Sequence, residues 1–295
     1  MYAVKKYAQF LGCPEAGMNQ ASNPVNPGRE LCFRAFRETL ENMRGREQVT
    51  EFSFTQEWLA RMRDYPSLTA NGWYDPPPDG IMVLSGRDDS KEPFRFASLR
   101  QPEYWPSRNR VIDWRHGIIY AYCSPLDTVR RLPADFGITL YFGSDPEVIA
   151  FYREALRVTR EIVEAIHPEM DARMLFERAA VIIRSARMSN NVSSITHSDP
   201  HDIGHSFPCL APGQPADRRL DALTISTIRN SRQYICREDS WHLSSVAQFT
   251  VEPNLVSLDN PALPQFSPHY VVAINQGAVA RSTDCDELFA TFGLL

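Results

Sequence analysis

The spacing of apolar residues predicts two helices near the beginning of the chain. In "GRELCFRAFRETLENMR", residues 28–44, apolar side chains recur every three or four positions, as they do on one face of an α-helix. These side chains are Cys32, Phe33, Phe36, Leu40 and Met43. "FTQEWLARM", residues 54–62, predicts a second, shorter helix that opens at a threonine cap, Thr55. Runs rich in β-branched and aromatic residues follow at 81–86 and 111–124 and predict strands.

The second half of the chain repeats this order. Within residues 145–170, apolar side chains recur at helical spacing up to Ile166, and the pattern stops before Pro168. Residues 171–187 predict another helix. The strand-like runs after them are residues 221–228, 247–253 and 269–277. Helices followed by strands, twice, predict an α+β fold in which helices cover a largely antiparallel sheet. The sequence itself does not repeat, so the recurring order indicates either two pseudo-symmetric halves or a coincidence.

Composition and charge exclude several classes of protein. The 295 residues are 43% apolar, enough for one large or two small globular domains. The net charge is −5, and the 31 Lys and Arg residues are scattered, which argues against nucleic acid as the main partner. We find no apolar run long enough for a signal peptide or a membrane span, so the sequence predicts a cytoplasmic protein that does not bind membranes. The six cysteines contain no CxxC pair and indicate neither a zinc ribbon nor a disulfide scaffold.

Three short segments carry the candidate chemistry. "PHDIGH", residues 200–205, sets His201 and His205 four positions apart. This pair is compatible with a metal site, with a catalytic base and a helper, or with a polar loop that holds two histidines. In "ADFGITLYFGSD", Asp135 and Asp145 are ten apart, and a straight strand would separate them by about 33 Å. A hairpin that reverses near Leu140 would bring the two carboxylates face to face, as a divalent cation requires.

The third segment is "FTVEPNL", in which Glu252 ends an apolar strand. Pro253 follows it and cannot donate a hydrogen bond to a neighbouring strand, so the carboxylate is expected at the rim of a sheet. Taken singly, each of these carboxylates and histidines also has a plain structural interpretation, as a solvated or hydrogen-bonded side chain.

Taken together and in order, these segments resemble the catalytic domain of the pita-bread family, which includes methionine aminopeptidase, Xaa-Pro aminopeptidase, prolidase and creatinase. That family binds two metal ions with an Asp-x-Gly hairpin and a second Asp, a His-Gly-x-Gly-His segment, a Thr-x-Glu-Pro-Gly segment and a final Glu before a strand. The resemblance covers roughly residues 28 to 290. It implies a tail over residues 1–27 and a single pita-bread domain over 28–295, with halves of about 28–133 and 134–295 and a curved antiparallel sheet covered by helices.

The resemblance also implies roles for individual residues. The implied metal ligands are Asp135, Asp145, His205 and Glu252. His201 would be a nearby proton donor or substrate contact, and His116 in "RHGI" would be the substrate-binding histidine. For both of these, a structural histidine held by a hydrogen bond is the alternative.

Several residues depart from the family pattern. Pro268 stands where the last bridging Glu is expected, and the neighbouring His269 offers a neutral nitrogen that could hold one ion without bridging two. Pro146 and Glu147 replace the family's Thr-Arg, and Asn254 replaces its Gly. The sequence therefore predicts one divalent ion (Mn, Fe, Co or Zn), or none, in place of two.

Three hypotheses about function follow. The first is a metal-dependent hydrolase of a small amide, dipeptide-like or amino-acid-derived substrate, with Glu252, His201 and His116 assisting catalysis. The second is a metal-free enzyme that resembles creatinase and cleaves a C–N bond by acid–base chemistry of His201, His205 and Glu252. The third is a non-catalytic binding module. The expected partner is a small molecule or short peptide, and the resemblance implies a homodimer.

Overall fold

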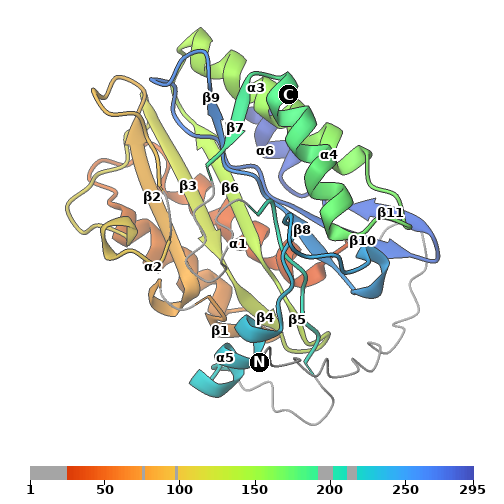
Figure 1. Ribbon diagram of the computed structural model, residues 1–295. Helices are drawn as coiled ribbons and strands as arrows, with labels where there is room; N and C mark the ends of the chain where they lie inside the picture. The colour runs from red at the N-terminus through yellow and green to blue at the C-terminus, as the bar shows by residue number, and fades with distance from the viewer. Residues whose placement is uncertain (1–24, 75–76, 97–98, 192–201, 211–217) are drawn as a thin grey trace, which may run out of the picture.

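The computed structural model describes residues 25–74, 77–96, 99–191, 202–210 and 218–295 (Figure 1). The first half opens with two helices, α1 (Pro27–Met43) and α2 (Glu51–Arg63). The side chain of Asn26 caps α1. Helix α2 begins earlier than predicted because Thr50, and not Thr55, is its cap and forms a capping box with Ser53.

A three-stranded antiparallel sheet, in the order β2-β3-β6, forms the centre of the molecule. The first-half strands and short 3₁₀ turns are β1 (Leu68–Gly72), η1 (Pro78–Gly80), β2 (Ile81–Arg87), η2 (Pro102–Tyr104), β3 (Gly117–Cys123), β4 (Pro125–Asp127) and β5 (Leu132–Pro133). Strand β6 (Phe136–Tyr141) is paired with β3 along its whole length. The hairpin considered near Leu140 is therefore wrong, because the chain runs straight through that residue.

Helices α1 and α2 lie behind this sheet in Figure 1 and pack on it through aromatic side chains. The rings of Phe36 and Trp58 lie 5.6 and 5.7 Å from the ring of Phe136, the first residue of β6. Strands β1, β4 and β5 form a second small sheet. Of the apolar positions that predicted the first helix, the fold buries Cys32, Phe33, Phe36 and Leu40, and Met43 is partly buried.

In the described residues, the second half supplies four further α-helices and two further sheets. Its elements are α3 (Pro146–Glu164), α4 (Ala172–Ser185), β7 (Met188–Asn190), α5 (Ala222–Ser231), η3 (Leu243–Ser245), β8 (Phe249–Val251), β9 (Leu255–Ser257), β10 (Tyr270–Asn275), β11 (Ala278–Arg281) and α6 (Asp286–Thr291). Strands β11, β10 and β8 pair antiparallel in that order, and β7 pairs with β9. This arrangement confirms the predicted α+β fold with antiparallel sheets.

The prediction of a strand over residues 221–228 is wrong, because helix α5 occupies this segment. The side chain of Asp221 accepts a hydrogen bond from the backbone of Thr224 and so starts a helix. Ile225 and Ile228, three positions apart, are both buried in a small apolar cluster with Trp73. Packing on that cluster outweighs the strand preference of the β-branched residues.

One continuous apolar core runs through both halves, from Cys32 on α1 to Leu294 near the last residue. Strand β6 opens the second half but pairs with β3 of the first, so the two halves share the central sheet. Within the described ranges, no helix is long and apolar enough to cross a membrane. Most of the predicted tail, and His201, lie outside the residues that the structure describes.

Candidate functional site

A short segment alongside β8 places His205 beside Glu252. The backbone N–H of Thr250 donates to the His205 carbonyl (2.8 Å), and that of Glu252 donates to the Ile203 carbonyl (2.8 Å). Gly204 permits this close approach, because its φ is +152° and a Cβ there would lie 2.1 Å from the Thr250 carbonyl oxygen. The glycine of "PHDIGH" is therefore required for the histidine to reach the carboxylate.

Strand register adds two more side chains to the same place. Strand β10 runs antiparallel to β8 with Tyr270 opposite Val251, so the next pair outward is His269 opposite Glu252. Asp135 immediately precedes β6, at the end of the central sheet that faces this pair. Four polar side chains, brought from four segments of the second half, thus converge.

Glu252 contacts both histidines of this cluster. His205 Nε2 lies 3.4 Å from Asp135 Oδ2 and 3.4 Å from Glu252 Oε1. Glu252 Oε2 lies 3.2 Å from His269 Nε2, and the hydroxyl of Thr250 donates to Glu252 Oε1 (2.8 Å). Asp135 and His269 are fully buried, whereas 22% of the Glu252 side chain is exposed. The cluster therefore reaches solvent at Glu252.

Electrostatics keep Glu252 ionised. Burial by itself would raise its pKa, but contacts with His269, His205 and the Thr250 hydroxyl lower the pKa of Glu252 to about 2. In contrast, burial, and next the charge of Glu252, raise the pKa of Asp202 to about 7. Asp202 is the aspartate inside "PHDIGH", and sequence reasoning considered only the histidines around it. The segment therefore supplies a titrating carboxyl group next to the cluster.

Hydrogen bonding fixes where His205 can take up a proton. Its Nδ1 lies 3.1 Å from the Ser206 carbonyl oxygen, which only accepts, so Nδ1 carries a proton. In the neutral ring Nε2 then presents a lone pair toward Asp135 and Glu252. Both oxygens of Asp135 are buried, and neither has a hydrogen bond among the described residues. A proton on Nε2 would satisfy these carboxylates, which makes His205 suited to act as a base.

An aromatic wall with a buried cation adjoins His205. The Trp73 ring lies 5.5 Å from the His205 ring in an edge-on arrangement, and the Arg232 guanidinium stacks 4.5 Å from Trp73 and 5.2 Å from Tyr234. Trp73 Nε1, and Nε and Nη2 of Arg232, are buried without a hydrogen bond to any part of the protein that the structure describes. These donors are available to a ligand. No periodic pattern or motif in the sequence indicated a role for Trp73 or Arg232.

Two of the predicted site residues lie elsewhere, at the far end of the central sheet. Asp145 caps α3, and its Oδ1 accepts from the backbone of Glu147 (2.8 Å). His116 precedes β3, is 53% exposed and contacts Asp88 (3.5 Å). Tyr141 joins these groups, since its hydroxyl donates to Asp88 and accepts from the Asp145 backbone N–H (2.9 Å). Because β3 and β6 are antiparallel, this end of the sheet lies away from Asp135, contrary to the prediction for both residues.

The chain is similar to several solved structures. The X-Pro aminopeptidase from Thermotoga maritima has 15% identity and a TM-score of 0.57, with 88% of this chain and 59% of that chain covered. The prolidase from Pyrococcus horikoshii has 14% identity and a TM-score of 0.56, with 88% and 60% covered. For a variant of Escherichia coli aminopeptidase P the identity is 12% and the TM-score 0.53, with 86% and 53% covered.

The chain has the pita-bread fold. The family resemblance read from the order of the motifs is thereby confirmed at the level of the fold. No family model matches the sequence, and no curated protein matches it. The chain spans about three-fifths of the length of the first two of these structures.

The two-metal centre that the pita-bread resemblance implies does not fit these residues. Asp145, the implied bridging ligand, caps a helix, and His269 fills the place next to the missing Glu. Arg29 contacts the other nitrogen of that ring, 2.7 Å from His269 Nδ1. In the described part of the chain, no group of three or more His, Cys, Asp or Glu side chains is arranged to hold a metal ion. His201, the remaining predicted residue, stays a prediction.

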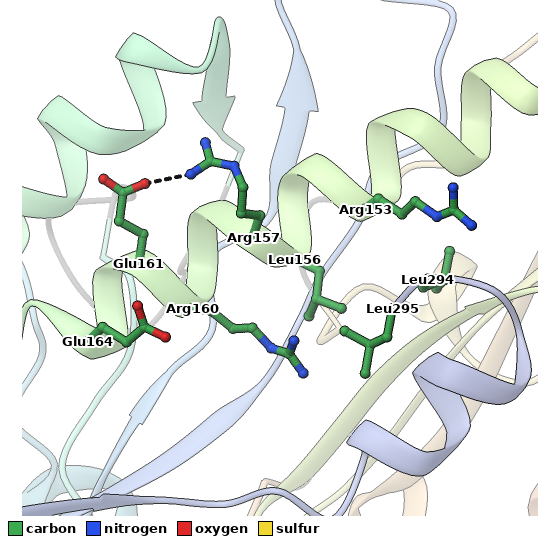
Figure 2. Close-up of a pocket in the computed structure, with 8 residues that line it drawn as sticks. All are labelled: Arg153, Leu156, Arg157, Arg160, Glu161, Glu164, Leu294 and Leu295. Atoms are coloured by element: carbon green, nitrogen blue, oxygen red, sulfur yellow. Dashed lines mark hydrogen bonds and ion pairs between the residues drawn. The ribbon is translucent and has the colours of Figure 1, made fainter.

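A surface pocket of about 350 Å³ lies away from this cluster, between α3 and the last residues of the chain (Figure 2). Its wall carries Arg157 and Arg160, and Arg157 pairs with Glu161 (2.8 Å). Arg160 pairs with Asp286 (2.8 Å). Since these charges are already paired, the pocket offers less unsatisfied chemistry than the cluster around Glu252.

Proposed function

We propose that this chain is a pita-bread enzyme that cleaves a C–N bond in a small amide or amino-acid-derived substrate by acid–base chemistry, without a metal ion. The observation that carries the proposal is the ionised carboxylate of Glu252 held between His205 and His269. The solved structures that the chain resembles are named as aminopeptidases and prolidases, which supports a substrate of this size and class.

The proton transfers follow from the contacts around His205. Water adds to the carbon of the C–N bond while His205 Nε2 takes the proton that the water loses. Asp135 and Glu252, each 3.4 Å from Nε2, offset the positive charge of the imidazolium. The same proton then passes to the leaving nitrogen as the C–N bond breaks. One water is consumed, and the side chains return to their starting states.

The aromatic wall supports a substrate that carries an acidic group. Trp73 and Arg232 present donors without partners beside His205, and a carboxylate would accept from both. We expect Arg232→Met to raise KM at least tenfold with little change in kcat, because the contact would be equally strong in the ground state and the transition state. A fall in kcat at unchanged KM would contradict this role.

The test of the proposed function uses protein purified without added metal. It would be assayed for amine or ammonia release from dipeptides and from N-acyl, N-carbamoyl and amidino amino acids, with and without a strong chelator. Turnover that survives chelation and is lost in Glu252→Gln is the expected result. Equal turnover in that variant would overturn the proposal. Binding of these compounds without turnover would favour a binding module instead.

A second candidate is a hydrolase with a single divalent ion. The favouring observation is that both oxygens of Asp135 are buried without a hydrogen bond in the described residues, a situation that a cation would relieve. Asp135, His205 and Glu252 are not arranged as a ligand set among the described residues, so they would have to move together to hold the ion, which would then supply an activated water. Elemental analysis separates the two candidates: about one equivalent of Mn, Fe, Co or Zn that disappears in His205→Ala would select the metal-dependent enzyme.

A further inference from the structure

Arg29 on α1 is buried at the back of the cluster, with only 1% of its side chain exposed. Its guanidinium has five N–H groups and no acceptor, and each group has a partner. The acceptors are Asp284 Oδ2 at 2.7 Å, the Asp135 carbonyl at 3.0 Å, His269 Nδ1 at 2.7 Å, the His269 carbonyl at 2.9 Å and Cys285 Sγ at 3.4 Å. With every donor used, the orientation of the guanidinium is determined.

This contact decides which nitrogen of His269 carries the proton. A guanidinium can only donate, so Nδ1, at 2.7 Å, must present a lone pair. A neutral histidine with a bare Nδ1 carries its proton on Nε2. Nε2 lies 3.2 Å from Glu252 Oε2, close enough for electrostatic attraction, although the pair does not have hydrogen-bond geometry among the described residues. His205 has the opposite arrangement, with the proton on Nδ1 and the lone pair on Nε2.

The ring of His269 has little freedom to escape this arrangement. It packs against the backbone of β6 at Gly137, where an added Cβ would lie 3.0 Å from the ring carbon Cδ2. The His269 carbonyl is also bound by Arg29 (2.9 Å), so backbone and ring are held by one side chain. A metal ion at Nε2 would have to displace the proton and leave an imidazolate, because Nδ1 cannot take that proton while Arg29 faces it.

We propose that Arg29 is a positioning residue that fixes His269 in the Nε2–H tautomer, so that His269 holds an N–H group beside Glu252 and does not act as a metal ligand. The consequence for turnover rests on the acid–base function proposed above, whereas the tautomer does not depend on it. In this arrangement the guanidinium of Arg29, and not a metal ion, supplies the positive charge next to Asp135. Arg29 thereby explains how a histidine is accommodated next to the position where the family resemblance implies a bridging carboxylate.

A purely structural role for Arg29 is the alternative, since it joins α1 to residues near the starts of β6, β10 and α6. The pair of Arg160 and Asp286 offers a matched control, because it also links a helix to the region of β10 and α6 (2.8 Å) without contacting His269. Losing either pair would reduce stability. Only the loss of Arg29 would change the protonation of the His269 ring.

The test is nitrogen NMR of protein with labelled histidine and arginine, with His269→Gln used to assign the ring. In the natural protein we expect a protonated Nε2, a bare Nδ1, and a coupling through the hydrogen bond between an Arg29 Nη and His269 Nδ1. A protonated Nδ1, or no such coupling, would overturn the proposal. This measurement needs neither turnover nor a folded Arg29 variant.

Two double variants then test whether Arg29 is the cause of the His269 tautomer. In Arg29→Met combined with Asp284→Asn, which leaves no buried carboxylate without its cation, we expect the coupling to be lost and Nδ1 to become partly protonated. In Arg160→Met combined with Asp286→Asn, the His269 signals should stay where they are. A folded Arg29 variant whose His269 remains wholly in the Nε2–H form would show that the tautomer has another cause. Absence of turnover alone would count against the proposed function and leave the tautomer untouched.

Discussion

Replacement of Asp202 by asparagine should stabilise the protein, and increasingly so as the pH rises. Asp202 is buried, and its pKa is raised from an ordinary 3.8 to about 7 by burial first and by the charge of Glu252 next. Because the pKa of Asp202 is higher in the folded protein than in the unfolded chain, its contribution to the free energy of unfolding is complete below the unfolded-state pKa. That contribution is lost as the pH rises through the folded-state pKa. The ionised carboxylate is therefore the costly form, and asparagine removes that cost.

The pKa difference of Asp202, about three units, sets the magnitude. At about 1.4 kcal/mol per unit, the free energy of unfolding gained by Asp202→Asn should grow by ~4 kcal/mol between pH 4 and pH 8. Titrations elsewhere in the chain cancel, to a first approximation, in the difference between the two proteins.

The assay is urea unfolding followed by the fluorescence of the five tryptophans at pH 4, 5, 6, 7 and 8. The exposed Asp64 provides the control, since Asp64→Asn should change stability by less than about 0.5 kcal/mol at each pH. A difference between Asp202→Asn and the natural protein that does not change with pH would refute the assignment of a raised pKa. So would a variant that is less stable than the natural protein at pH 8.

Three further substitutions test the placement of the site residues. Gly204→Ala should lower the free energy of unfolding by about 4 kcal/mol or more, measured by thermal or urea unfolding, because its Cβ would lie 2.1 Å from a carbonyl oxygen. Gly45→Ala, with open space around the new Cβ, should cost only about 1 kcal/mol. Similar losses in the two variants would contradict the close approach at Gly204. Asp145→Ala should remove the cap of α3 and cost about 1 kcal/mol of stability without affecting turnover, and a loss of activity in the folded variant would return Asp145 to the site. His116→Ala should leave kcat and KM unchanged within about twofold in steady-state assays, since it lies at the opposite end of β3, and a larger effect would place it in the substrate's path.

Part of the candidate site was predictable because its residues sit in recognisable local sequence. Asp135 before a strand, His205 in "PHDIGH" and Glu252 before Pro253 were each identified from neighbouring residues, and the structure brings these three together. His269 was noted only because it stands beside Pro268. Asp202 belongs to the same "PHDIGH" segment, but its raised pKa depends on burial, which the sequence does not reveal.

Arg29 shows what local sequence does not reveal. In the sequence it is one basic residue at the start of a helical pattern, with no local feature that sets it apart. Its partners are 106 and 240 positions away, at Asp135 and His269, so its role exists only once the two halves have closed around α1. Asp145 illustrates the reverse case, since its spacing from Asp135 matched the family approximately while its local surroundings, Pro146 and Glu147, favoured a helix cap.

The sequence by itself determined the helices α1, α3 and α4, the strands β2, β3, β8 and β10, and the order of motifs that identified the fold. These features depend on periodic burial and on short-range hydrogen bonds, which neighbouring residues dictate. Tertiary structure alone decided that β6 runs straight, that α5 is a helix, and which polar side chains meet. Those outcomes depend on contacts between segments far apart in the chain, and such contacts form only when the core between the two halves is packed.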